Sequence, residues 1–420
     1  MKRYAMNQIV CSVLFALVLL CSCHQNNTVA DNYDIIPINA DKNHPLINLK
    51  LSEIAEISYI PLKTDDILIS NGSMSRMIFL YKDKIYVGDH DLNHPKLVVF
   101  DRFGSLVQVI GSKGRGPGEY INLTAFAVDT ITNEIFVFDR RQLKFIVYDI
   151  DGKFKREKSL QEMNRDQKWL DEIEIINDNY ILAYNKRSLE VATADFRAGE
   201  ILVVKKGQTL TFGKTIMIID KQTLSEVRYR NFEYAKAGMF RVYTVFYPLI
   251  SLSGGVYIAS ERSDTIYFMN RNLEIIPKFR DVTDYKSKYG GRIIPVAETE
   301  RYTFFITRGA SVALDIDDRN NFVQIAKRFF VYDKELETVF HLNNGLPEKD
   351  VEDGDNNIAL LNDQIALNEY SLTLNHNYAV TTLFPNFLFE HYNQLPKELK
   401  EIIKSLREDD NPVIMLIKLK

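Results

Sequence analysis

The fold of this chain is indicated first by the stretch Gly111-Ser-Lys-Gly-Arg-Gly-Pro-Gly-Glu-Tyr120, which lies between two segments of alternating apolar and polar residues. Its four glycines and one proline predict a tight connection with positive φ angles and close backbone approach. Before this stretch, short polar turns separate four predicted strands at residues 76–81, 84–89, 96–101 and 105–110. Together these strands indicate one antiparallel meander.

The chain after the glycine-rich stretch repeats this pattern. Strands are predicted at residues 125–129, 134–139, 144–149 and 153–158. In both units the third strand ends in the same kind of hairpin turn, which begins at Asp101 in the first unit and at Asp149 in the second. Related turns begin at Asp220, Asn270 and Asp333. Their spacing indicates units of about 50 residues, two of which carry insertions.

A four-stranded unit repeated in series is typical of a β-propeller, whose blades bury their faces by stacking around an axis. Five units are visible, and the two chain ends are expected to build a sixth blade from residues 57–62 and 413–419, because closure removes exposed strand edges. A short helix starting near Pro396 is predicted before the last strand. The predicted fold is therefore all-β, with residues 51–420 forming a six-bladed propeller of four-stranded antiparallel blades.

The N-terminus has the features of a secretory leader. Lys2 and Arg3 precede an apolar stretch at residues 9–20 that is too short to span a bilayer comfortably. Leu20-Cys21-Ser22-Cys23 follows and looks like a bacterial lipobox. We therefore expect residues 1–22 to be a signal peptide, Cys23 to be the lipid attachment site, and residues 23–50 to form a tether and an N-terminal strand. All three cysteines lie at or before Cys23, so no internal disulfide is expected.

Three segments carry a resemblance to a known family. Residues 114–120, 263–267 and 406–414 resemble the six-bladed β-propeller lipoproteins of Bacteroidetes, which are distant, NHL-like propellers without a settled activity. The resemblance implies a ring that is lipid-anchored to the outer membrane in the cell envelope. Surface-exported lipoproteins of that phylum often carry acidic residues after the lipidated cysteine, whereas His24, Gln25 and Asn26 follow Cys23 here. Both the periplasmic and the surface-facing side therefore stay open.

Composition and motifs narrow the possible functions. The formal net charge is -4, and this lack of a basic surplus argues against nucleic acid as a partner. The glycine-rich stretch does not match a phosphate-binding loop, because its spacing differs and a strand follows it. No catalytic residue and no cofactor are predicted, although calcium in the acidic loops at residues 315–318 and 352–355 remains a weaker alternative. His90 and His94 are four residues apart but lie in a predicted loop, so no metal site is predicted.

The repeat order predicts where a binding site lies. Connections between strands two and three open on the same face as the crossovers between blades, and we expect function to favour that face. It carries ligand-binding candidates of mixed charge: His90, His94, Lys113, Arg115, Glu119, Arg140, Arg141, Glu261 and Arg262. Such a rim suits a polar or anionic ligand or an envelope protein. Binding or scaffolding is the favoured function, and a lyase-type or hydrolase-type enzyme with its site on the channel axis is the alternative; solvated loop charges remain equally compatible with the pattern.

Overall fold

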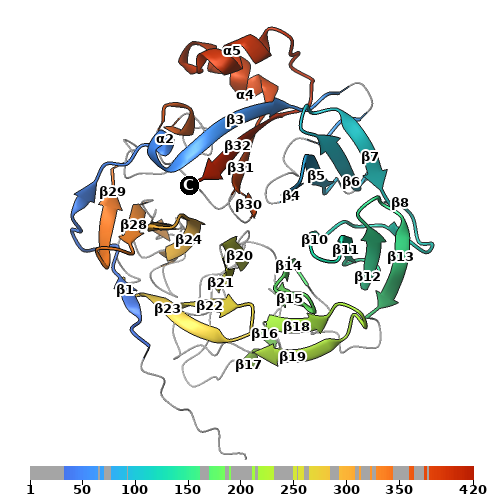
Figure 1. Cartoon of the computed structure of the whole chain (residues 1–420), viewed down its shortest axis with the longest axis horizontal. Coiled ribbons are helices and arrows are strands. Elements are labelled where there is room, and N and C mark those ends of the chain that lie inside the picture. The colour runs from blue at the N-terminus through green and yellow to red at the C-terminus, as the bar shows by residue number, and fades with distance from the viewer. Residues whose placement is uncertain are drawn as a thin grey trace, which may run out of the picture. The chain divides into compact units, whose positions relative to one another are not determined.

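The computed structural model describes residues 33–64, 67–70, 77–91, 93–160, 170–184, 189–190, 211–212, 216–230, 249–252, 254–259, 264–283, 293–307, 312–313, 322–323, 328–343, 359–363, 373–375 and 378–420. The chain divides into two units, Met1–Asp34 and Ile35–Lys420, and the second is described here. Six antiparallel sheets surround a central axis as the blades of a propeller (Figure 1). The predicted fold class is therefore confirmed.

Each blade is given with its strands from the innermost to the outermost. Blade 1 contains β4 (Ile78–Tyr81), β5 (Lys84–Asp89), β6 (Lys96–Asp101) and β7 (Leu106–Ile110). Blade 2 contains β10 (Ala125–Asp129), β11 (Glu134–Asp139), β12 (Lys144–Asp149) and β13 (Phe154–Ser159). Blade 3 contains β14 (Glu172–Ile175), β15 (Tyr180–Tyr184), β18 (Ile216–Asp220) and β19 (Glu226–Arg230).

The second half of the ring has the same order. Blade 4 contains β20 (Leu249–Leu252), β21 (Gly255–Ile258), β22 (Thr265–Asn270) and β23 (Ile275–Asp281). Blade 5 contains β24 (Ile293–Glu298), β25 (Tyr302–Thr307), β28 (Phe329–Asp333) and β29 (Thr338–Leu342). Blade 6 contains β30 (Thr373–Asn375), β31 (Tyr378–Leu383), β32 (Val413–Leu419) and β3 (Ala55–Pro61).

The two predicted insertions are confirmed, and both hold a small hairpin between the second and third strands of a blade. Blade 3 carries β16 (Leu189–Glu190) paired with β17 (Thr211–Phe212), and blade 5 carries β26 (Val312–Ala313) paired with β27 (Phe322–Val323). The glycine-rich stretch forms the short parallel pair β8 (Ser112–Lys113) and β9 (Glu119–Tyr120). These pieces leave the four-stranded blades themselves unchanged.

The turns predicted at the end of each third strand are built by one side chain. Asp101 Oδ1 accepts hydrogen bonds from the backbone N–H groups of Phe103 and Ser105, both at 2.8 Å. The residues that end the third strands of blades 2 to 5 accept in the same way, and they are Asp149, Asp220, Asn270 and Asp333. An Asx side chain that binds the backbone two to four residues ahead closes a hairpin locally, which explains why the sequence repeat marks the blades.

The ring closes through both ends of the chain, as predicted. β3 pairs antiparallel with β32, and the register runs from Ala55 opposite Leu419 to Pro61 opposite Val413. β32 lies between β31 and β3, so the C-terminal strand is hydrogen-bonded on both edges. Blade 6 therefore joins residues that are separated by almost the whole chain.

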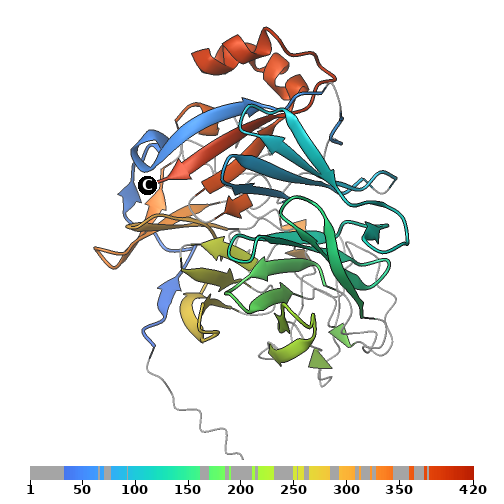
Figure 2. The ribbon, with the colours of Figure 1, turned by 45° about the vertical axis from the view of Figure 1, so that its right-hand side comes forward.

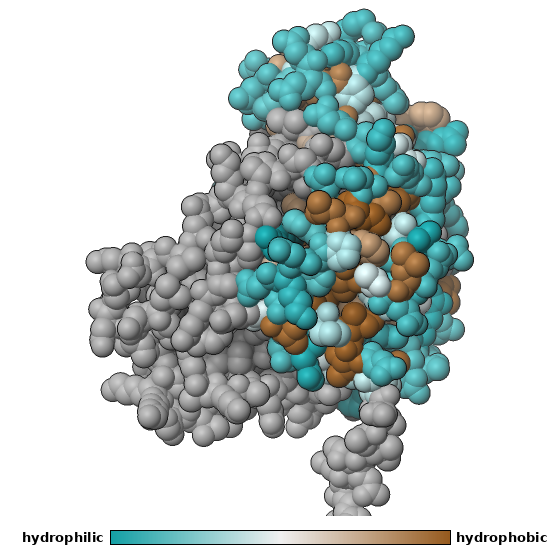
Figure 3. Space-filling model, turned by 90° about the vertical axis from the view of Figure 1, so that its left-hand side faces the viewer, coloured by the Kyte–Doolittle hydropathy of each residue, from teal (hydrophilic) through white to brown (hydrophobic). Residues whose placement is uncertain are grey.

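The N-terminal segment does more than close blade 6. β1 (Ile36–Ile38) adds to the outer edge of blade 4 in parallel with β23, and β2 (Leu46–Ile47) adds in parallel with β29 of blade 5. An N-terminal strand was predicted within residues 23–50, but its parallel partner was not, because pairing with a distant edge has no local sequence signal. The added strands follow the outside of the ring (Figure 1), and on this side apolar groups lie among hydrophilic side chains (Figure 3).

Short helices cover the outer side of blade 6. The predicted helix is confirmed as α5 (Lys397–Ile403), in which Leu399 and Ile403 are buried. α4 (Pro385–Glu390), the 3₁₀ helix η2 (Tyr392–Gln394) and α2 (Leu51–Ile54) were not predicted, since each is too short to show a clear apolar period. α4 and α5 lie outside β3 at the rim (Figures 1 and 2). Within the described part of the chain, no helix has the length and apolar character needed to cross a membrane.

Candidate functional site

The ring has two different faces. On one face, here called the turn face, the connections between strands one and two and between strands three and four are short, and the longest comprises residues 221–225. The opposite face, here called the loop face, carries the connections between strands two and three and the crossovers between blades. It also carries the hairpins β16–β17 and β26–β27, which are inserted between the second and third strands of blades 3 and 5. Residues beyond those needed to connect the strands therefore lie on the loop face. Binding residues are commonly found in such loops.

Two buried carboxylates organise the described part of the loop face. Asp89 and Asp139 each end the second strand of a blade, and neither is exposed to solvent. Asp89 Oδ2 accepts a hydrogen bond from Ser70 N at 3.0 Å and lies 3.3 Å from Lys96 Nζ. Asp139 Oδ2 accepts one from Ile121 N at 2.6 Å. Because both carboxylates are saturated by fixed partners, they hold the loops in place and are not free to bind a ligand.

The residues that follow these carboxylates, His90 and Arg140, each contact the segment just before the innermost strand of the next blade. The His90 ring is hydrogen-bonded to the backbone of Leu123, which lies just before the innermost strand of blade 2. Arg140 Nη1 lies 3.4 Å from a carboxylate oxygen of Asp171, just before the innermost strand of blade 3. Burial lowers the pKa of His90, and the Arg140 cation lowers it further, while Leu123 and Asp89 act in the opposite direction. The positive charge of Arg140 therefore acts on the His90 ring, while the His90 ring contacts Leu123 and the Arg140 guanidinium contacts Asp171.

Two more candidates extend this surface away from the axis. Lys113 Nζ donates a hydrogen bond to the backbone oxygen of Asn93, so the glycine-rich crossover contacts the loop that carries His94. The His94 side chain is 80% exposed, and its Nδ1 lies 4.0 Å from Asp91 Oδ2. We call the surface formed by His90, Asn93, Lys113, Leu123 and Arg140 the blade 1–2 junction. It joins residues from three separate connections.

The other residues of the glycine-rich stretch contact blade 2 and one another. Gly118, at a φ of 70°, donates its N–H to Glu157 Oε2 of β13 at 3.1 Å. Glu119 Oε2 accepts a hydrogen bond from Gly116 N at 2.7 Å, so this carboxylate folds the loop back on itself. Because β13 is the outermost strand of blade 2, the contact of Gly118 with Glu157 brings this end of the stretch to the outer edge of that blade. Arg115 of the same stretch is exposed. The interpretation of this stretch as a tight crossover agrees with these contacts.

The remaining candidates divide into two groups. Arg141 is exposed beside the junction, and its backbone N–H donates to Asp139 Oδ1 at 2.8 Å. The neighbouring Gln142 donates from Nε2 to Gly114 O at 3.1 Å and so ties this loop to the glycine-rich crossover. Other predicted positions lie outside the described residues, and these are Cys23, Glu261, Arg262 and the acidic loops at residues 315–318 and 352–355.

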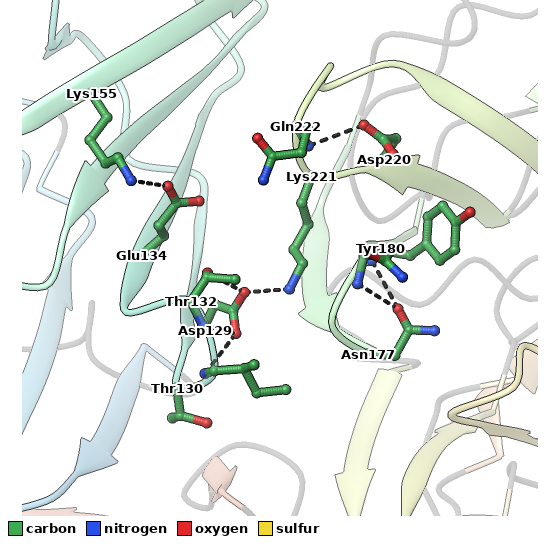
Figure 4. Close-up of polar contacts among 12 residues, drawn as sticks. Asp129, Thr130, Thr132, Glu134, Lys155, Asn177, Tyr180, Asp220, Lys221 and Gln222 are labelled. Atoms are coloured by element: carbon green, nitrogen blue, oxygen red, sulfur yellow. Dashed lines mark hydrogen bonds and ion pairs between the residues drawn. The ribbon is translucent and has the colours of Figure 1, made fainter.

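A second charged cluster lies on the turn face, between blades 2 and 3. Lys221 follows β18, and its Nζ forms an ion pair with Asp129 Oδ2 at the end of β10 (Figure 4). Arg156 binds both carboxylate oxygens of Glu134, at 2.8 and 2.9 Å, and Lys155 also contacts this carboxylate. Burial would raise the pKa of Glu134, but the hydrogen bonds from Arg156 and Lys155 hold it below the usual value. Each of these charges already has an opposite charge as its partner, which is the arrangement of a structural clamp.

Two carboxylates on the innermost strand of blade 3 were not predicted as site residues. Glu172 Oε2 accepts a hydrogen bond from Leu249 N at 3.0 Å, and Glu174 Oε2 accepts one from Ser251 Oγ at 2.7 Å. Both contacts link β14 to β20 of blade 4. The alternation Glu172-Ile-Glu-Ile175 was the available signal, because residues two apart in a strand share a face. Among the residues that the structure describes, no three His, Cys, Asp or Glu side chains are grouped so that they could hold a metal ion.

Comparison with known proteins identifies the family. The chain matches the family described as "Domain of unknown function (DUF4934)" over residues 33–418 and belongs to it. The search of curated proteins found no match. Among solved structures, the chain is similar to a protein of Bacteroides fragilis NCTC 9343 that is described as a candidate exported protein, with a TM-score of 0.57 and 18% identity over 89% of this chain and 99% of the other. A DUF4221 member from Bacteroides vulgatus ATCC 8482 has a TM-score of 0.45 and 12% identity over 87% and 99%.

Proposed function

We propose that this protein is a lipid-anchored cell-envelope protein of the outer membrane whose propeller binds a polar or anionic ligand, or a protein, on its loop face. The blade 1–2 junction is the proposed site. The single observation that carries the proposal is that His90 and Arg140 occupy equivalent positions of adjacent blades on the loop face, where the charge of Arg140 acts on the His90 ring. The description of the Bacteroides fragilis protein as a candidate for export supports the envelope location.

The chemistry of this pair suits a ligand that carries both an acidic group and a hydrogen-bond donor. A neutral imidazole that donates one N–H to a backbone carbonyl retains its second nitrogen as an acceptor. The Arg140 guanidinium can donate charge-assisted hydrogen bonds to carboxylate or phosphate groups. A sugar acid or a hydroxy acid combines the two features. The ion pair with Asp171 fixes the position of the Arg140 guanidinium, and the Arg140 side chain is still 33% exposed.

One observation favours an enzyme as the second candidate function. A histidine that is neutral near pH 7 can accept a proton, and Arg140 could stabilise a developing negative charge on the substrate. This alternative corresponds to a lyase or hydrolase that acts at the mouth of the axis. It differs from the binding proposal in requiring turnover, so replacing His90 by Gln should abolish product formation while leaving measurable ligand affinity.

The binding proposal is tested with a panel of defined small anions. Glucuronate, galacturonate, citrate and phosphate are titrated against the purified protein, and binding is measured by calorimetry and by the shift in melting temperature. The double variant Arg140→Ala with Arg141→Ala should lose affinity for any anion that binds. The matched double variant Arg102→Ala with Lys153→Ala removes two positive charges from the turn face. Equal losses in the two double variants would show that the site is not on the loop face.

A further inference from the structure

The outer edges of the six blades differ in what covers them. Blades 4 and 5 each carry a fifth strand from the N-terminal segment, and blade 6 ends in β3, against which α5 packs. In the part of the chain that the structure describes, blades 1, 2 and 3 end in β7, β13 and β19. An outermost strand presents backbone N–H and C=O groups that can pair with another chain, and proteins usually protect such edges with charge or cover.

The edge of blade 1 lacks charged side chains, unlike the edges of blades 2 and 3. β13 contains Lys155, Arg156, Glu157 and Lys158, whereas β7 reads Leu106-Val-Gln-Val-Ile110. Val107 and Val109 are each 45% exposed, and Phe103 in the preceding turn is 64% exposed. Gln108 donates to Ile150 O of blade 2 and so faces away from the valines, because neighbouring residues of a strand point to opposite sides. The side of β7 left open is therefore apolar.

Positive charge brackets this apolar edge at both ends. Lys63 donates from Nζ to Ser105 Oγ at 2.8 Å, which places it at the start of β7 beside Arg102. Lys113 follows the end of β7, and no acidic residue occurs between Arg102 and Gly118. The exposed Asp83 lies 3.9 Å from Arg102, a separation at which an exposed ion pair has little effect. The charge pattern suits a segment with aliphatic residues in the middle and acidic residues at its ends.

The chain itself contains such a segment on an equivalent edge. Residues 34–41 read Asp-Ile-Ile-Pro-Ile-Asn-Ala-Asp, and Ile36–Ile38 pairs in parallel with β23, the outermost strand of blade 4. The fourth strand of a blade of this ring therefore accepts an extended, aliphatic, acid-flanked strand in parallel. We propose that β7 is a docking edge that binds an extended segment of a partner protein in the same way. The proposal rests on strand pairing and not on the ligand site proposed above.

A labelled peptide tests this proposal directly. A fluorescein-labelled peptide with the sequence of residues 31–41 is titrated against the full-length protein, in which β23 is already occupied, and binding is followed by fluorescence anisotropy. Saturable binding is expected, and Val107→Lys with Val109→Lys should weaken it by about tenfold or more, because lysines on a strand edge oppose pairing. Ile131→Lys is the matched control, since it replaces an aliphatic residue that is 52% exposed on the turn face. Equal affinity in both variants would overturn the proposal.

Two further measurements keep the result independent of variant folding. A peptide in which every backbone nitrogen is methylated has no N–H donor at either edge, so unchanged binding of that peptide to the unmodified protein would exclude strand addition. Light scattering of the protein at increasing concentration tests a second copy as the occupant. A dimer that is lost in the double lysine variant would show that the edge serves self-association, and it would refute a separate partner.

Discussion

Lys221 of blade 3 and Asp129 of blade 2 form an ion pair in which the lysine side chain is 2% exposed and the aspartate side chain is not exposed at all (Figure 4). The backbone oxygen of Lys221 also accepts a hydrogen bond from Arg156 at 2.8 Å, and the hydroxyl of Thr132 donates to Asp129 Oδ2 at 2.6 Å. Two neighbouring blades are thus joined through one lysine. Because both side chains are buried, water does not stabilise either charge, and the stability of each charge depends on the other.

Removing one member of this pair should destabilise the protein strongly. Lys221→Met leaves Asp129 buried without its counter-ion, and such a change typically costs about 3 to 5 kcal/mol in the free energy of unfolding. Urea unfolding followed by fluorescence measures the loss. Lys153→Met is the matched control, because Lys153 is exposed in the corresponding turn of blade 2. The variant Lys221→Met with Asp129→Leu should recover much of the stability, and a loss as large as that of the single variant would contradict this account.

Closure of blade 6 predicts a different kind of failure. Deleting residues 412–420 removes β32 from between β31 and β3, so both neighbours lose their backbone partners and their apolar faces become exposed. We expect aggregation rather than a small decrease in melting temperature. The comparison is deletion of residues 1–50, which removes β1 and β2 but keeps β3. Size-exclusion chromatography separates the two outcomes, and a soluble monomeric protein lacking 412–420 with an unchanged melting curve would refute closure.

Local sequence patterns were sufficient to predict most of the ring. The strands of blades 1 and 2 were predicted to within two residues, because each is bounded by turn-forming residues such as Asp101 and Asp149 whose effect is local. The parallel pairing of Ile36–Ile38 with β23 could not be predicted, since the partner lies more than two hundred residues away and short apolar segments do not specify one edge.

The candidate site was predicted only in part, for a similar reason. The repeat places His90 and Arg140 at equivalent positions after Asp89 and Asp139, and this equivalence was visible in the sequence. The repeat cannot show in which direction a crossover between blades runs, because the crossover has no periodic pattern of its own. The contact of Gly118 with Glu157 of β13, which brings this end of the stretch to the outermost strand of blade 2, had no such signal.

The lipid anchor stays a prediction that fractionation can test. Cys23→Ala should release the protein from membranes into the soluble envelope fraction, because two or more acyl chains are what hold such a protein stably at a bilayer surface. Cys21→Ala is the matched control, since Cys21 lies within the predicted leader and should not be lipidated. Retention of the Cys23→Ala protein in membranes after a detergent-free wash would show that another feature holds it.

The state of His90 predicts how stability depends on pH. Because burial and then Arg140 lower the pKa of His90 in the folded protein, the unfolded chain binds the proton more readily. Well above pH 6.5, His90 is neutral in both the folded and the unfolded chain, so its contribution to the free energy of unfolding is complete. This contribution is lost progressively as pH falls below about 6.5, the usual pKa of histidine. His90→Asn should therefore reduce the loss of stability between pH 7 and pH 5, measured by urea unfolding at each pH.

Arg140→Met should raise the pKa of His90 toward the usual value and reduce the same loss of stability. A two-dimensional NMR titration of the His90 ring would detect this change in pKa directly. The exposed His94→Asn is the control for removing a histidine, and an equal effect of His90→Asn and His94→Asn would show that the His90 environment does not cause the dependence.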